Sequence, residues 1–241
     1  MSGGVSVRGL TVALAGRPVV RCLSFEAPAG GWFGVLGVNG SGKTTLLRAL
    51  AGRLEPTDGA ILLGGAHLDH RARAHRIGFM PDQADLPALL TGGDLVDLLA
   101  LSRGGEPRLA KAARERLGVG PLLDLRIGAM SSGMRQRLAV YAAFIGERPV
   151  LVFDEPFNWL DPIAAHDLRG LLRQAVAEGR TVITTLHDAA AFVLNCTEGM
   201  VLHEGELLRR YEAGRLPALR GDVAAFEADL YAAMTGGIAR A

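Results

Sequence analysis

Hydrophobic and polar residues alternate along the first part of the chain, as they do in strands with one buried face. Alternation covers residues 5–14 and 19–27, and the Ala-Gly-Arg-Pro turn separates the two runs. The apolar run at 32–36 has the length of a buried strand, and a helical pattern follows at 44–54. The N-terminal region is therefore predicted to be mainly strands that lead into one helix.

The pattern changes to helical periodicity between about residues 84 and 147, after two further short strands are expected at 60–65 and 76–81. Three segments carry this periodicity, and almost no strand pattern interrupts them: 95–102, 108–119 and 134–146. We interpret this region as a helical insertion.

Strands and helices alternate in the last third of the chain. The expected order is a strand at 149–155, a helix at 162–179, a strand at 180–187, a helix at 188–195 and a strand pair at 198–210. This alternation favours a parallel sheet with crossover helices. The tail from residue 215 to 241 predicts one amphipathic helix, at 222–234.

Composition excludes several classes of protein. The 241 residues are 49% hydrophobic and carry a net charge of +1, which argues against disorder and against strong attraction to nucleic acid. No apolar run approaches the ~20 residues that cross a bilayer. The basic cluster at 71–76 is expected to be a solvated loop, and Cys22 and Cys196 are expected to be buried, reduced thiols.

A glycine-rich segment lies between the predicted strand at 32–36 and the helix after it. Gly37, Gly42, Lys43 and Thr44 fit the G-x-x-x-x-G-K-[ST] pattern, in which backbone N–H groups surround phosphates. Lys43 would lie near the outer phosphates, and the Thr44 hydroxyl would bind Mg²⁺. The remaining residues expected in this phosphate site are Val38, Asn39, Gly40, Ser41 and Thr45.

Two further positions could act on a bound phosphate. Asp154 and Glu155 end an apolar strand, and the carboxyl end of a strand is where α/β sheets bind ligands. Asp154 would hold Mg²⁺ and Glu155 would activate a water molecule. His187 ends a later strand and could contact the outermost phosphate.

The segments GVNGSGKTT, SSGMRQRLA, VLVFDEP and LDP, with His187, occur in an order that resembles the ATP-binding cassette (ABC) family. The likeness is greatest to the separate ATPase subunits of exporter-type, ABC-2-like transporters. With the hydropathy pattern it predicts an α/β fold: a P-loop NTPase core with a mostly parallel sheet, an antiparallel N-terminal β subdomain and a helical insertion. The cassette would cover residues 1–214, with 215–241 as an extension.

The resemblance implies a head-to-tail dimer of cassettes that encloses ATP and Mg²⁺. Ser131, Ser132 and Gly133, which we call the signature loop, would cap the nucleotide bound to the partner cassette, and Asp161 would lie at the dimer seam. Lys43, Glu155 and His187 would be catalytic. Such a subunit works on the cytoplasmic face of the membrane through a separate permease, which sets the cargo.

Several positions depart from the family pattern. Leu14 or a neighbour stands where an aromatic residue usually stacks on adenine, so we expect weaker nucleotide binding. Ser132 replaces a glycine, where an N-cap serine would fit, and Met134 replaces a glutamine. Trp159 is unusual beside the dimer seam, where it could pack against a partner or fill a local gap.

The glutamine that would sense Mg²⁺ and the permease could be placed in two ways, because Asp82 and Gln83 are adjacent. We choose Gln83 as a catalytic and metal-side residue, since an amide can bond both a metal-bound water and the backbone. The permease groove would lie near Gln83 and residues 84–101.

Three other functions are compatible with parts of the sequence. A regulatory cassette would bind ATP with little turnover, and the altered signature loop favours it. A soluble, non-transport ABC ATPase would usually carry two cassettes or a long coiled coil. A phosphate-loop kinase or GTPase outside the family would leave the signature segment and His187 without a role.

Overall fold

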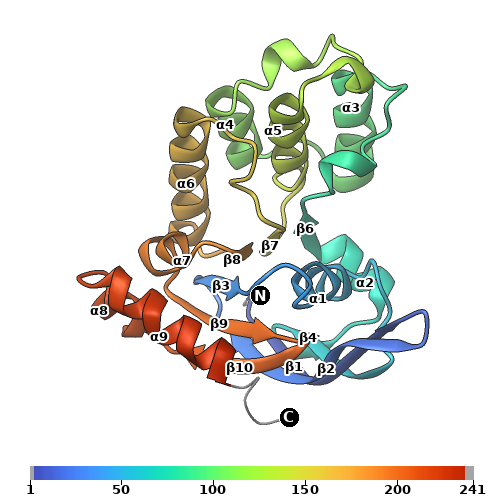
Figure 1. Ribbon diagram of the computed structural model, residues 1–241. Coiled ribbons are helices and arrows are strands. Elements are labelled where there is room, and N and C mark those ends of the chain that lie inside the picture. The colour runs from blue at the N-terminus through green and yellow to red at the C-terminus, as the bar shows by residue number, and fades with distance from the viewer. Residues whose placement is uncertain (1–2, 237–241) are drawn as a thin grey trace.

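Two β-sheets form the lower and middle parts of the molecule in the computed structural model, which describes residues 3–236 (Figure 1). The first sheet is antiparallel, with the strand order β2-β1-β4-β5. Its strands are β1 (Val5–Leu14), β2 (Arg17–Ala27), β4 (Asp58–Leu63) and β5 (Ala66–His67). The predicted antiparallel N-terminal part is therefore present.

The second sheet has the order β10-β9-β3-β8-β7-β6, and its pairs are parallel except for β9 with β10. Its strands are β3 (Trp32–Leu36), β6 (Ile77–Phe79), β7 (Val150–Phe153), β8 (Thr181–Leu186), β9 (Glu198–His203) and β10 (Glu206–Tyr211). Helices connect the parallel strands, as the alternating pattern predicted, and the α/β fold class is confirmed.

Residues 3–236 contain nine helices, some of which pack on the faces of this second sheet. They are α1 (Lys43–Leu50), α2 (His70–Arg76), α3 (Gly92–Arg103), α4 (Arg108–Arg116), α5 (Ser132–Ala142), α6 (Pro162–Ala177), α7 (Ala189–Asn195), α8 (Arg215–Leu219) and α9 (Val223–Gly236). Short 3₁₀ turns occur at η1 (Gln83–Asp85), η2 (Gly120–Leu122) and η3 (Ile127–Ala129). The expected helical insertion contains α3, α4 and α5, at the top of Figure 1.

Alternate residues of the central strands belong to two apolar cores. Phe33 and Val35 of β3 pack with α1 and the antiparallel sheet, whereas Trp32 and Leu36 pack with the helices of the opposite face. This division follows from the two-residue repeat of a strand, which sends successive side chains to opposite faces. The parallel sheet is thus buried on both sides, and its ligand-accessible part is its strand ends.

The C-terminal tail packs on the main core. Phe226 of α9 stacks on Phe192 of α7, with the ring centroids 6.2 Å apart, and meets Tyr211 edge to face. Leu216 and Leu230 are buried in the same cluster. The predicted helix at 222–234 is therefore present and attached to the cassette.

Two expectations about the surface are wrong. Residues 71–76 form most of α2, because Asp69 caps this helix by accepting from the Ala72 N–H at 2.7 Å, and Arg73 is buried with its guanidinium donating to the Leu68 carbonyl. Cys22 is exposed in β2, and only Cys196 is buried. Both cysteines are unpaired, as expected.

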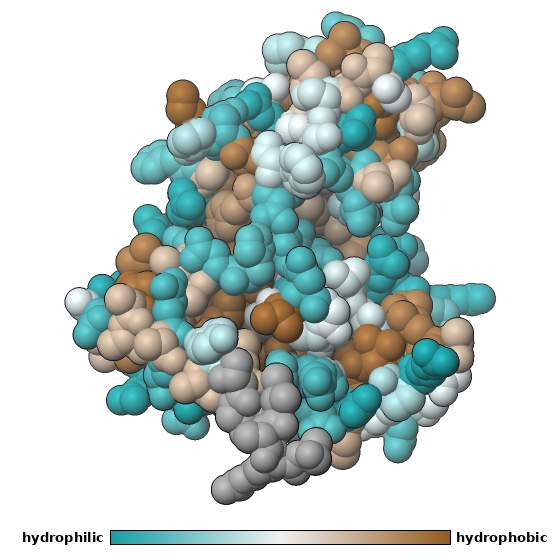
Figure 2. All heavy atoms as spheres, in the orientation of Figure 1, coloured by the Kyte–Doolittle hydropathy of each residue, from teal (hydrophilic) through white to brown (hydrophobic). Residues whose placement is uncertain are grey.

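Hydrophilic residues dominate the middle of the face drawn in Figure 2, between the helices above and the sheets below.

Within residues 3–236, none of the helices combines the length and the apolar character needed to cross a bilayer.

Candidate active site

Three neighbouring strands bring the predicted site residues to one edge of the sheet. In the parallel register, Leu36 of β3 lies beside Leu186 of β8, and Phe153 of β7 lies beside Thr184 of β8. The loops that follow these strands therefore begin side by side, at the carboxyl edge where α/β sheets bind ligands. They deliver the glycine-rich loop, His187 and the Asp154–Glu155 pair.

The glycine-rich loop, Gly37–Gly42, which we call the phosphate loop, has the backbone that a phosphate cradle requires. Gly42 has φ of +101° at the start of α1, a conformation that L side chains rarely adopt. A side chain at Gly37 would place its Cβ 2.5 Å from the Leu202 carbonyl oxygen. A hollow of about 200 Å³ lies over the loop, lined by Asn39, Gly40, Gly42, Lys43, Thr44 and Thr45 among others.

The polar groups of this loop suit an anion. Lys43 is buried, and its ammonium donates to the carbonyls of Gly37 at 2.8 Å and Val38 at 3.1 Å. The Ser41 hydroxyl oxygen is buried and has no hydrogen-bond partner. A buried polar atom without a partner is costly. Phosphate oxygens are ligands that such a hydroxyl and the loop N–H groups can bind.

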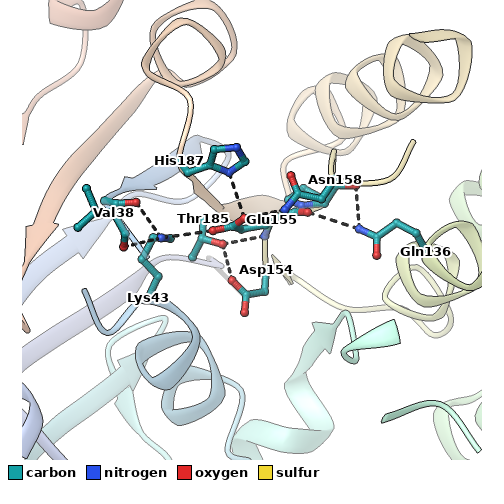
Figure 3. A network of polar contacts seen from close by, with 10 residues as sticks. Val38, Lys43, Gln136, Asp154, Glu155, Asn158, Thr185 and His187 are labelled. Atoms are coloured by element: carbon teal, nitrogen blue, oxygen red, sulfur yellow. Dashed lines mark hydrogen bonds and ion pairs between the residues drawn. The ribbon is translucent and has the colours of Figure 1, made fainter. Parts of the chain in front are cut away.

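Glu155 lies between Lys43 and His187 (Figure 3). Its Oε1 is 3.3 Å from Lys43 Nζ, and its Oε2 is 3.0 Å from His187 Nδ1. The Asn158 side chain donates to Oε2 at 2.7 Å. Glu155 has φ of +44°, which turns the chain sharply after β7 and directs this carboxylate over the phosphate loop.

Two opposing effects act on the pKa of Glu155. Burial raises the pKa, but the hydrogen bond from Asn158 and the charges of Lys43 and His187 lower it by more, so the net shift is downward from 4.5. The carboxylate is therefore ionised at neutral pH, in the form that can accept a proton.

Thr185 of β8 connects the two acidic residues. Its hydroxyl donates to Asp154 Oδ1 at 2.5 Å and accepts from the Glu155 N–H at 2.8 Å. Because Thr185 is buried, this hydroxyl holds the backbone of Glu155 and the side chain of Asp154 in fixed positions.

A second hollow, of about 190 Å³, is also lined by Glu155. Thr44, Asp154, Asp82 and Gln83 line it, so both candidate residues of the 82–83 pair are near the predicted metal ligands. Asp82 uses its carboxylate to cap η1, accepting from the Ala84 N–H at 2.9 Å. This bond favours Gln83 as the metal-side residue, although that assignment stays a prediction.

The oxygen donors around this hollow suit Mg²⁺, which phosphate and water would help to hold, rather than a metal bound only by protein side chains. In the described part of the chain, no group of three or more His, Cys, Asp or Glu side chains is placed to hold a metal ion. Mg²⁺ is commonly held by one or two protein oxygens together with phosphate and water. The Thr44 hydroxyl and the Asp154 carboxylate are donors of that kind.

The signature loop lies at the start of α5. Ser131 is the N-cap, and its hydroxyl accepts from the Met134 N–H at 3.2 Å, so the helix begins at Ser132, earlier than Met134 where we expected it. The capping role that we gave to Ser132 thus belongs to Ser131. A side chain at Gly133 would place its Cβ 3.0 Å from the Trp159 carbonyl oxygen.

Asp161 makes two contacts within its own chain. It caps α6 by accepting from the Ala164 N–H at 2.9 Å, and it forms an ion pair with Arg137 of α5. The hydrogen bond from Ala164 lowers the pKa of Asp161, and the charge of Arg137 adds to this effect. Leu14 is exposed near the β1–β2 turn.

Three polar residues of the site were missed from the sequence: Thr185, Asn158 and Gln136. The buried Gln136 side chain donates to the carbonyls of Glu155 at 3.4 Å and Pro156 at 3.2 Å. Threonines in the apolar strand 181–186 were a usable signal, since a buried hydroxyl requires a partner. Asn158 and Gln136 carried no such signal.

Comparison with known proteins gives consistent results. The family model described as "ABC transporter" matches residues 20–158. "ATP-binding cassette sub-family A member 7" of Mus musculus is 34% identical over 231 residues, which cover 89% of this chain and 11% of that protein. "Nod factor export ATP-binding protein I" of Burkholderia orbicola is 34% identical over 214 residues, which cover 83% of this chain and 68% of that protein.

A solved structure shows the same fold along nearly the whole chain. The protein described as "ATP binding subunit of ABC transporter" superposes with a TM-score of 0.82 at 26% identity, covering 96% of this chain and 99% of that one. The order of strands, phosphate loop and helical insertion is therefore an arrangement found in other proteins.

Proposed function

Since this chain belongs to the ABC transporter family, we propose that it is the ATP-hydrolysing cassette that drives a separate membrane permease. The cassette would comprise residues 1–214, and 215–241 would be an extension of it. Residues 1–2 and 237–241 of these ranges lie outside the described residues.

The observation that carries this proposal is the position of Glu155. Its ionised carboxylate lies 3.3 Å from the Lys43 ammonium and 3.0 Å from His187, at the edge where three parallel strands end. A base adjacent to a phosphate cradle is the arrangement that positions a water molecule for attack on a phosphoryl group. Gly37–Thr45 would hold the phosphates, with the Ser41 hydroxyl and Lys43 ammonium as donors.

ATP with Mg²⁺ supplies the transferable phosphoryl group and a divalent charge that offsets the charge developing on it. Thr44 and Asp154 are the residues that would hold Mg²⁺, with Gln83 orienting its water shell. Glu155 would accept the proton of the attacking water on its carboxylate. His187 and Asn158 both contact Oε2, so they restrict how that carboxylate can rotate.

A second cassette would complete the site. The signature loop offers the free N–H groups of a helix start, a position that favours anions, and no hydrogen bond joins it to the phosphate loop of its own chain within residues 3–236. This separation supports use of the loop by a partner cassette. Asp161 would lie at the seam, with homodimer and heterodimer both compatible.

The partner in the membrane would be a permease on whose cytoplasmic face the cassette sits. Leu89, Leu98 and Leu101 are exposed apolar residues between residues 84 and 101, where we expect the groove for that permease. Export is favoured because the Burkholderia relative is named as an export protein.

The test is ATP hydrolysis by the purified chain and by Glu155→Gln, at matched nucleotide occupancy. We expect a loss of at least about 10²-fold in turnover, because the amide cannot accept a proton. Equal rates for the two proteins would contradict a catalytic role.

A regulatory cassette with little turnover is the second candidate, and Met134 in place of the usual glutamine favours it. It predicts that wild type and Glu155→Gln both bind ATP and both hydrolyse it at the same slow rate. The same experiment therefore separates the two functions.

A further inference from the structure

The Gln83 side chain is held between two other segments of the chain. One end of its amide lies 2.7 Å from the Ser132 carbonyl oxygen, and the other end lies 3.2 Å from Trp159 Nε1. The nitrogen is assigned to the end facing Ser132, because two acceptor oxygens at that separation would repel each other. The amide thus donates to the signature loop and accepts from the indole of Trp159.

Trp159 has an unusual conformation for so large a residue. Its φ is +63°, a left-handed value that bulky side chains rarely adopt because it is strained. Such strain persists where the surroundings fix it.

The ring of Trp159 does not fill a gap in the core. Phe157 and Leu160 of the same turn pack against the main core, whereas Trp159 is 67% exposed. The interaction that distinguishes this indole from another apolar side chain is its N–H bond to Gln83.

We propose that Trp159 is a positioning residue for Gln83: its indole N–H fixes the orientation of the amide, and the signature loop holds the other end. This inference rests on the proposed function, because it assigns Gln83 to the metal side of an ATP site.

The physical consequence is a fixed acceptor at the wall of the 190 Å³ hollow. An amide oxygen has two lone pairs, and the indole occupies one of them. The other stays available to a metal-bound water, and hydrogen bonds of this kind determine how tightly a metal is held. Without the indole, only the bond to Ser132 holds the amide, and the orientation of its oxygen is less restricted.

The contact can be tested in the nucleotide-free chain by NMR of the indole N–H groups. The chain has two tryptophans, Trp32 and Trp159, and the Trp159 signal is identified by its loss in Trp159→Phe. We expect Gln83→Ala to shift the Trp159 signal and speed its hydrogen exchange. The Trp32 signal should not move, because that indole donates to Thr184 at 2.9 Å inside the core.

The role can be tested by the Mg²⁺ dependence of binding of a non-hydrolysable ATP analogue. Trp159→Phe and Gln83→Ala should each raise the Mg²⁺ concentration for half-maximal binding about 3- to 10-fold, the effect of losing one hydrogen bond. The double variant should be no weaker than Gln83→Ala alone, since two residues acting through one contact are not additive. Ile163→Ala, which removes another exposed apolar side chain, is the matched control and should behave as wild type.

An unmoved Trp159 signal in Gln83→Ala would overturn the contact, and additive effects in the double variant would overturn the positioning role. Both readouts are independent of turnover. A wild-type chain that fails to hydrolyse ATP would refute the proposed function while these results still decide the role of Trp159.

Discussion

Replacing Thr185 with valine should separate the stability of the site from its chemistry. Valine matches the shape of threonine but lacks the hydroxyl. The change removes the bond to Asp154 Oδ1 and leaves the Glu155 N–H without its acceptor. Both acidic residues then lose the group that fixes them to β8.

The magnitude follows from the two bonds. A hydrogen bond to a charged group is worth about 1.5–3 kcal/mol and one between neutral groups about 0.5–1.5 kcal/mol, so the free energy of unfolding should fall by about 2–4 kcal/mol. For a chain of this size each kcal/mol lowers Tm by about 2–4 °C. Displacement of a catalytic group by about 1 Å can cost 10²-fold in rate, which we expect for ATP turnover.

Thr184→Val is the matched control, because it is the same change at the preceding residue of the same buried strand. It removes the acceptor of the Trp32 indole N–H, at a cost of about 1–3 kcal/mol, on the opposite side of the strand from the acidic pair. Turnover is compared at a temperature where both variants are fully folded, as thermal unfolding followed by circular dichroism establishes. Similar turnover in the two variants would refute the role given to the Thr185 hydroxyl.

Three further changes test other parts of the site. The pKa of Glu155 is lowered in the folded chain, so the ionised carboxylate stabilises the fold at pH values above 4.5, its ordinary pKa. Urea unfolding should show that wild type loses its greater free energy of unfolding, relative to Glu155→Gln, as pH falls through the lowered pKa. A difference that grows in acid would contradict this. Ser131→Arg should leave ATP binding intact and abolish hydrolysis, with Ser131→Asn as the control that keeps the N-cap. Retained turnover in Ser131→Arg would mean that the signature loop only forms the N-terminus of α5. Leu14→Tyr should tighten nucleotide binding, by up to about 1–3 kcal/mol from base stacking, and a calorimetric titration without any gain would remove Leu14 from the base site.

The α/β fold class and the convergence of the main candidate residues could be predicted because each has a local cause. A buried strand ends at Phe153 and another at Leu186, so Glu155 and His187 had to emerge at the same edge if the strands were parallel neighbours. The glycine pattern at 37–42 fixed the phosphate loop independently of the rest of the chain. Alternating strands and helices supplied the parallel topology.

Features that depend on backbone conformation and on tertiary context could not be predicted in this way. The Asn158–Glu155 bond depends on the sharp turn after β7, and nothing in the local sequence indicates that Glu155 has a positive φ. Hydropathy also failed at residues 71–76, because the helix is set by the Asp69 cap and by a buried arginine, neither of which gives an apolar stripe. Cys22 is exposed because of its position on β2, and this position cannot be inferred from the residue type.

The start of α5 is connected to the turn 154–161 directly at two points and through Gln83 at a third, which gives the signature loop a route to Glu155 of its own chain. The Gln136 side chain holds the carbonyls of Glu155 and Pro156, and Arg137 pairs with Asp161. Ser132 binds Gln83, which in turn binds Trp159. Because Gln136 is buried, α5 cannot shift without either carrying this turn along or breaking these bonds. In the dimer that we propose, contact of the signature loop with a partner's phosphate would therefore act on Glu155 through hydrogen-bonded neighbours, so that occupancy of one site would affect the proposed base of the other.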